Sequence, residues 1–196
     1  MDKPTLNDHP IHELARTRWS PRAFSPDPIE DAVLYRLLEA ARWAPSCFNE
    51  QPWELYVATS RSPERHRRFA GLLNPFNHQW AAPAPVLMVA AAREHFTRNG
   101  DPNMHAGYDL GQAIAWLTVQ ATSEGLRMHQ IGGFDKAEAA RLLACPPGTR
   151  PYAMIALGHP VDPATLTEEQ LEREMAPRVR RPLTAFVHGG QHGEPL

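Results

Sequence analysis

Two arginine clusters near opposite ends of the chain carry the groups best suited to bind an anion. Arg18 and Arg22 flank Ser20 within five residues, and Arg178 and Arg180 would lie on one side of an extended segment. A guanidinium group forms planar, charge-assisted bonds with phosphate or carboxylate that are about twice as strong as neutral hydrogen bonds. The two clusters could therefore bind one phosphate together, although each alone is also typical of a solvated surface.

A short polar loop between two prolines is a second candidate for ligand binding. Residues 44–53 read Ala-Pro-Ser-Cys-Phe-Asn-Glu-Gln-Pro-Trp. Pro45 is expected to end the preceding helix, and Pro52 favours extended geometry where the next strand begins. The hydroxyl and amide groups between them are therefore predicted to lie on a rigid connection, and such loops carry function more often than packing.

A pair of glycines at the end of a predicted strand is the third candidate. Residues 130–135 read Gln-Ile-Gly-Gly-Phe-Asp, and Gly132 and Gly133 would let backbone N–H groups approach a flat ligand closely. An ordinary tight turn is an equal alternative. The chain lacks the glycine spacing of a dinucleotide fold and of a phosphate-binding loop, so neither a Rossmann nor a P-loop site is predicted.

The elements that must position these residues follow from the periodicity of apolar residues. A helix is expected from Asp27, because Pro28 suits the first helical position and Glu30 completes a capping-box-like pair with Asp27. The other predicted helices are a short one at Pro10–Arg16, a long one at Tyr108–Glu124 ended by Gly125, one from Asp135 to Leu143, and one at Thr167–Met175. The predicted strands are Trp53–Thr59, Val86–Ala91, Leu126–Ile131 and Tyr152–Leu157. Because helices and strands mix without regular alternation, the sequence predicts an α+β fold.

Composition narrows the class of protein further. The 196 residues, 42% of them hydrophobic, predict one domain over residues 1–187, followed by a flexible Gly- and His-rich tail over residues 188–196. A net charge of -2 argues against a nucleic-acid partner. The most apolar run, Ala81–Ala92, is well short of the roughly 20 residues that span a bilayer, so no membrane partner is expected. Two cysteines and the lack of a signal-peptide pattern favour a cytoplasmic protein.

Taken together, the motifs resemble the nitroreductase family of flavin-dependent oxidoreductases, from about Arg18 to Leu183. The resemblance rests on Arg-x-Ser-x-Arg-x-Phe at 18–24, Pro-Ser-x-x-Asn-x-Gln-Pro-Trp at 45–53, Asn77 ahead of the central strand, Gly-Gly-Phe-Asp at 132–135, and the basic pair Arg178 and Arg180. It implies a three-layer fold with a mixed, mostly antiparallel central sheet flanked by helices. It also implies an intertwined homodimer with two FMN molecules at the interface, each touched by both subunits.

The resemblance implies that arginines from both clusters bind the phosphate end of the cofactor and that one arginine lies at its ring. The residues that would hold the FMN phosphate are Arg18, Ser20, Arg178 and Arg180, with main-chain and packing contacts from Trp19 beside it. Arg22 would lie near the pyrimidine edge of the flavin, where a fixed cation stabilises the negative charge of the reduced ring.

The remaining motifs would surround the flavin ring. Asn77 would bond the amide-like edge of the ring, and the turn formed by Gln130, Ile131, Gly132 and Gly133 would present its backbone N–H groups to it. From the other subunit, the residues against the ring and its ribityl chain would be Pro45, Ser46, Cys47 and Asn49.

The implied activity is that of an NAD(P)H oxidoreductase. NADH or NADPH would reduce bound FMN and leave, and a nitroaromatic, quinone or related small acceptor would then take the electrons in a ping-pong mechanism. Because the cofactor carries the hydride chemistry, no protein residue is assigned a catalytic role. A flavin-binding or storage protein without turnover would carry the same motifs and stays open.

Two other chemistries have weaker support in the sequence. A hydrolase using Cys47 as nucleophile needs a nearby base, and the sequence places no particular histidine beside this residue. The histidine pairs at positions 9 and 12 and at positions 188 and 192 lack acidic or cysteine partners at ligand spacing, so no metal site is predicted.

Overall fold

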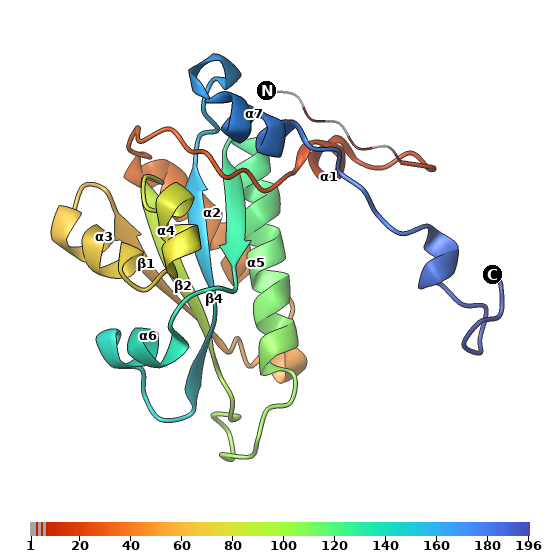
Figure 1. Ribbon diagram of the computed structural model, residues 1–196. Coiled ribbons are helices and arrows are strands. Elements are labelled where there is room, and N and C mark those ends of the chain that lie inside the picture. The colour runs from red at the N-terminus through yellow and green to blue at the C-terminus, as the bar shows by residue number, and fades with distance from the viewer. Residues whose placement is uncertain (1–2, 4, 6) are drawn as a thin grey trace.

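The computed structural model describes residues 3, 5 and 7–196 and shows a sheet between two layers of helices (Figure 1). Within the described residues, every strand pair is antiparallel and the sheet has the order β1-β2-β4-β3. The strands are β1 (Trp53–Thr59), β2 (Val86–Arg93), β3 (Arg127–Ile131) and β4 (Thr149–Gly158). All four predicted strands are confirmed, including the central position of β2, and β4 begins three residues earlier than expected.

Helices cover both faces of this sheet. On one face lie α2 (Asp31–Arg42) and α5 (Ala106–Ser123), and on the other lie α3 (Pro63–Ala70), α4 (Pro75–Ala81) and α6 (Lys136–Leu142). The remaining helical segments are α1 (Glu13–Thr17), α7 (Glu168–Met175) and the short turns η1 (Cys47–Asn49), η2 (Pro163–Thr165) and η3 (Leu183–Ala185). The predicted α+β, three-layer fold is therefore confirmed, whereas the sheet of the described chain is wholly antiparallel where a mixed, mostly antiparallel sheet was expected.

The central strand β2 joins two separate hydrophobic cores. Val86 and Met88 pack with α2 and α5, whereas Leu87 and Val89 face α3, α4 and α6. Every residue from Val86 to Ala92 is buried. A strand that is buried on both faces carries a continuous apolar run, which is the pattern from which this strand was predicted.

The predicted start of α2 is wrong by four residues. The helix begins at Asp31, with Glu30 as an N-cap that makes no side-chain cap bond. The Asp27 carboxylate instead accepts a hydrogen bond from the Ser25 hydroxyl at 2.5 Å. Prolines at 26 and 28 remove two backbone donors, and Asp27 is engaged locally, so the segment runs extended to the helix while Ile29 still enters the core.

Three other predicted helix ends are confirmed by their caps, whereas α1 begins at Glu13, three residues after the predicted start at Pro10. Gly125 takes a φ of 75° just beyond α5, the left-handed conformation that glycine adopts readily. Asp135 caps α6 by accepting the Glu138 N–H, and Thr167 and Gln170 form a capping box on α7. Helices α3 and α4 were not predicted.

The C-terminal segment after α7 leaves the body of the molecule (Figure 1). Its apolar side chains include Val179, which is 76% exposed, and Phe186, which is 51% exposed. The chain as described thus carries an extended arm with apolar groups that its own core does not cover. None of the helices in the described part of the chain is both long and apolar enough to cross a membrane.

Candidate functional site

The two arginine clusters come together in the structure. Arg18 follows α1, and Arg178 and Arg180 follow α7. Burial, and then the charge of Arg180, lowers the pKa of the Arg18 guanidinium. Burial, and then the charges of Arg18 and Arg180, likewise lowers the pKa of Arg178. Three guanidinium groups from distant parts of the sequence therefore share one electrostatic environment.

This cationic cluster forms no ion pair among the described residues. The ion pairs of the described chain involve other arginines, and Asp8, which borders the same cavity, takes part in none of them. Arg18 Nη1 donates to Ser20 Oγ at 3.3 Å, which keeps the predicted hydroxyl beside the cluster. A cavity of about 790 Å³ is bordered by all three arginines. An anion in this cavity would relieve the repulsion between them.

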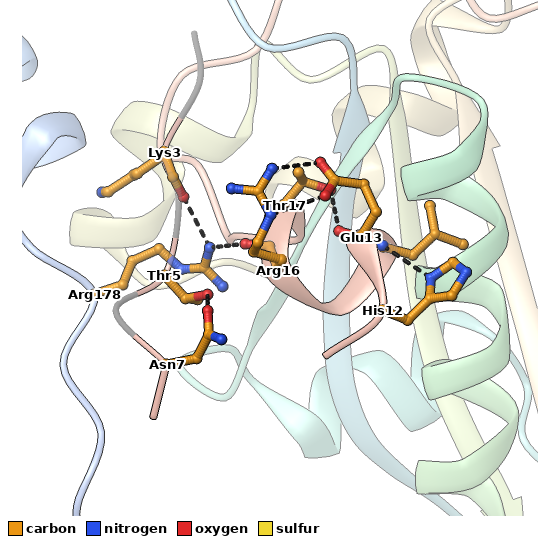
Figure 2. A network of polar contacts seen from close by, with 9 residues as sticks. Lys3, Thr5, Asn7, His12, Glu13, Arg16, Thr17 and Arg178 are labelled. Carbon is orange, nitrogen blue, oxygen red and sulfur yellow. Dashed lines mark hydrogen bonds and ion pairs between the residues drawn. The ribbon is translucent and has the colours of Figure 1, made fainter. Parts of the chain in front are cut away.

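Arg178 is held firmly by the N-terminal part of the chain. Its Nη1 donates to the backbone oxygens of Lys3, at 2.9 Å, and of Arg16, at 2.7 Å, as Figure 2 shows. Charge-assisted bonds to two carbonyl groups fix the guanidinium in place without neutralising it. The cluster is thus preorganised before any ligand binds.

Trp19 and Arg22 flank Ser20, one of the residues expected to hold the phosphate, and their surroundings differ. Trp19 is 4% exposed, and its buried Nε1 has no hydrogen-bond partner in the described structure. The Arg22 backbone N–H donates to Glu174 Oε1 at 2.5 Å, while the Arg22 side chain is exposed beside a second cavity of about 380 Å³. Burial raises the pKa of the Glu174 carboxyl, and the Arg22 N–H bond opposes this rise.

The glycine pair and Asn77 meet at the end of β3. Asn77 Nδ2 donates to the Gly133 carbonyl at 3.0 Å, and the Asn74 backbone N–H donates to the same oxygen at 3.1 Å. A Cβ atom at Gly133 would lie 2.5 Å from Asn74 Nδ2, whereas a Cβ atom at Gly132 would meet nothing within 4 Å. Gly133 is therefore required by close packing, and Gly132 leaves an open surface to which a flat ligand could lie close.

The two residues before the glycines differ in what they can offer a ligand. Gln130 is exposed, but the Ile131 side chain is 3% exposed and packs in the core. Only the backbone of Ile131 is available at this position.

The loop between the two prolines is rigid and strained. Phe48, Asn49 and Gln51 have φ values of 53°, 57° and 49°, in the left-handed region that residues other than glycine rarely adopt. The Cys47 backbone N–H donates to the buried Asp109 carboxylate at 3.0 Å, and the Gln51 N–H donates to Ser46 Oγ at 3.0 Å. The hydrogen bonds hold the loop in a conformation that its sequence alone would not favour.

The structure leaves this loop far from the arginine cluster. The bond to Asp109 ties the loop to the first turn of α5, and in Figure 1 the turn η1, in orange, lies at one end of α5 while α1 lies near the other. A helix of 18 residues is about 27 Å long. One chain therefore brings Arg18, Arg178 and Arg180 together but does not bring Pro45, Ser46, Cys47 and Asn49 to them.

Several residues that contact the candidate site were not singled out from the sequence as site residues. They are Trp80, which donates to Asn77; His129, whose ring lies against Trp80; Glu174, which accepts from Arg22; and Asp109, which accepts from Cys47. Trp80 follows Asn77 by three residues, a spacing that places both on one face of a helix. The other three depend on contacts between distant segments and leave no local signal.

The comparisons with known proteins agree with this fold. The nitroreductase family model matches residues 15–74 and 63–159, and the chain belongs to this family. A Mycolicibacterium smegmatis protein described as an uncharacterized 15.4 kDa protein in ask 5'region is 38% identical over 133 residues, which cover 68% of this chain and 88% of that protein. A Bacillus subtilis FMN reductase [NAD(P)H] is 26% identical over 158 residues, covering 72% of this chain and 62% of the reductase.

A solved structure resembles the whole chain closely. It is described as an oxidoreductase containing FMN and superposes with a TM-score of 0.91 at 34% sequence identity, covering 97% of each chain. The match covers nearly the whole chain, so the fold is shared with a structure described as containing FMN.

Proposed function

We infer that this protein is an FMN-dependent oxidoreductase that accepts a hydride from NAD(P)H and passes electrons to a nitroaromatic, quinone or related small acceptor by a ping-pong mechanism. The observation that carries this proposal is the convergence of Arg18, Arg178 and Arg180 at one cavity, with no ion pair to any of them among the described residues. The similarity to a solved FMN-containing oxidoreductase and to an FMN reductase supports it.

The residues present fit FMN. Its phosphate carries close to two negative charges, and the arginine cluster with Ser20 offers several donors from different segments. The buried Trp19 Nε1 has no partner among the described residues, although Trp19 does not border the cavity itself. The open surface at Gly132 suits a flat ring. These groups belong to the predicted set of cofactor ligands, which stays a proposal.

The residues of the chain bind and orient the cofactor and need not react themselves. Bound FMN would supply the hydride chemistry. Arg22 would place a cation beside the ring where negative charge collects on reduction, and its backbone is fixed by Glu174. The Gly132 and Gly133 backbone and the Asn77 amide would orient the ring from its edge.

We propose that the active form is a homodimer in which each FMN contacts both subunits. One chain holds the arginine cluster and the Pro45–Asn49 loop at opposite ends of α5, so a partner chain is needed to complete either site. The exposed apolar groups of the C-terminal arm are available to pack on that partner. Sedimentation should give the mass of two chains, and a variant that is monomeric should lose FMN with the loop intact.

We propose domain boundaries and a cellular compartment for this protein. Residues 1–187 form a single FMN-binding domain and residues 188–196 a flexible tail, although positions 1, 2, 4 and 6 lie outside the described residues. Both cysteines are free, in keeping with a reducing cytoplasmic location.

An absorbance experiment tests the proposal directly. Purified protein should be yellow and should lose its oxidised flavin absorbance when NAD(P)H is added without oxygen. Arg18→Ala should weaken FMN binding, whereas Arg141→Ala, which removes an exposed arginine paired with Glu138 on α6, should not. Protein that stays colourless after incubation with FMN would refute the proposal. If the protein binds FMN but shows no NAD(P)H oxidation with any acceptor tested, the result would instead support a storage protein.

A further inference from the structure

The amide of Asn77 is held in one orientation by two hydrogen bonds. Trp80 Nε1 donates to Asn77 Oδ1 at 3.2 Å, and Asn77 Nδ2 donates to the Gly133 carbonyl at 3.0 Å. An indole N–H can only donate and a carbonyl can only accept, so the opposite orientation of the amide would lose both bonds. One Nδ2 hydrogen and one Oδ1 lone pair remain free for a ligand.

A histidine connects this arrangement to the Arg22 segment. The His129 ring lies 4.4 Å from the Trp80 ring, and His129 Nδ1 lies 2.7 Å from the Pro21 carbonyl. Because the carbonyl can only accept, Nδ1 carries the proton and donates. Burial lowers the pKa of His129, in keeping with a neutral ring that donates through Nδ1. Pro21 directly precedes Arg22, so one packed chain of groups joins the Arg22, Asn77 and Gly133 segments.

We propose that Trp80 and His129 are positioning residues for the pyrimidine edge of the flavin. Trp80 holds the Asn77 amide so that its free hydrogen and free lone pair face a neighbouring carbonyl and N–H of the ligand. The pyrimidine edge of a flavin offers such a pair at its N3–H and the adjacent carbonyl. His129 bonds the Pro21 backbone and packs against Trp80. It therefore fixes the position of Arg22 relative to Asn77. The proposal rests on the proposed binding of FMN.

Two observations favour positioning over packing alone. Trp80 is only partly buried, and it stands at the edge of the core cluster rather than inside it. Its one polar atom is used on Asn77, and its ring borders the same cavity as the Arg22 side chain. A phenylalanine would keep an aromatic ring at this position and would remove the N–H donor together with the five-membered part of the indole.

The experiment compares two ligands in flavin-free protein. FMN and N3-methyl-FMN are titrated into wild-type and Trp80→Phe protein, with binding followed by flavin fluorescence. In wild type, methylation should weaken binding about tenfold, the effect of roughly one ligand hydrogen bond. In Trp80→Phe, FMN should bind about tenfold more weakly and the penalty for methylation should fall below about threefold, since the amide is no longer fixed.

Matched variants separate the donor from general damage. Trp116→Phe makes the same change at a half-exposed site on α5 and should leave both affinities unchanged. Trp80→His keeps a planar ring with an N–H and should restore the penalty for methylation. His129→Leu should shift the midpoint potential of bound FMN to more negative values, because Arg22 is less firmly placed beside the ring.

The outcomes are distinguishable from failure of the proposed function. If wild-type protein does not bind FMN, the proposed function is wrong. If wild type binds FMN and Trp80→Phe shows the wild-type affinity and penalty for methylation, the positioning role of Trp80 is wrong. Equal behaviour of Trp80→Phe and Trp80→His would also refute it, since only one of them can donate. An unchanged potential in His129→Leu would refute the role of His129.

Discussion

Replacing Gly133 by alanine should destabilise the protein, and the structure gives the size of the effect. The added Cβ would lie 2.5 Å from Asn74 Nδ2 and 2.6 Å from Asn77 Nδ2, so both amides must move. Moving Asn74 disturbs the N-cap of α4, which is worth about 1 kcal/mol. Moving Asn77 breaks its bond to the Gly133 carbonyl, worth about 1 kcal/mol more. The expected loss in the free energy of unfolding is therefore about 2 kcal/mol.

Gly132→Ala is the matched control, because its Cβ would meet nothing within 4 Å. In thermal unfolding of flavin-free protein, the midpoint temperature of Gly133→Ala should lie about 4–8 °C below that of wild type, since 1 kcal/mol corresponds to roughly 2–4 °C in a chain of this size. Gly132→Ala should unfold near the wild-type temperature but bind FMN more weakly, because its methyl group stands on the surface proposed to face the ring. Equal stability of Gly133→Ala and wild type would show that the close packing of the turn is not needed.

Three further outcomes are expected. The Arg36 hydrogen bond lowers the pKa of Glu124 to about 2. The pair therefore stabilises the fold at pH values above the ordinary carboxyl pKa of 4.5 and loses that contribution as the pH falls toward 2. Urea midpoints of Glu124→Gln should depend less on pH in this range than those of wild type. Asp109→Ala leaves the Cys47 N–H without its acceptor and should cost about 1–3 kcal/mol in chemical unfolding, with loss of bound FMN. Cys47→Ser should keep full NAD(P)H oxidation, because the backbone and not the thiol bonds Asp109; loss of this activity would show that the thiol itself is needed.

The fold was predictable where one segment carried a strong pattern of its own. The continuous apolar run of β2 and the apolar stripe of α5 reflect burial against the layers beside them. Helices α3 and α4, of eight and seven residues, are too short to show a helical period, and both begin at a proline that also reads as a break. The start of α2 was wrong because a local bond from Ser25 occupies Asp27.

The candidate site was predictable in its residue types but not in its supporting contacts. The arginine pairs and the glycine pair can be read directly from the sequence. Anion binding needs guanidinium groups, and close approach of the backbone to a ligand needs residues without a bulky side chain. The bonds of Asp109 to Cys47 and of Glu174 to Arg22 join residues 62 and 152 positions apart, and such pairs follow only from the folded arrangement. The donor role of Trp80 became evident only from its hydrogen bond to Asn77 in the folded structure.

The length of α5 has a genetic consequence. In the proposed dimer each chain gives its arginine half to one flavin and its loop half to the other, because the two halves lie at opposite ends of this helix. A chain with Arg18→Ala and a chain with Asp109→Ala would each form homodimers with two damaged sites. When the two chains assemble together, both lesions fall in one site and the other site is intact. Two inactive alleles would therefore complement each other to about half of normal activity per mixed dimer.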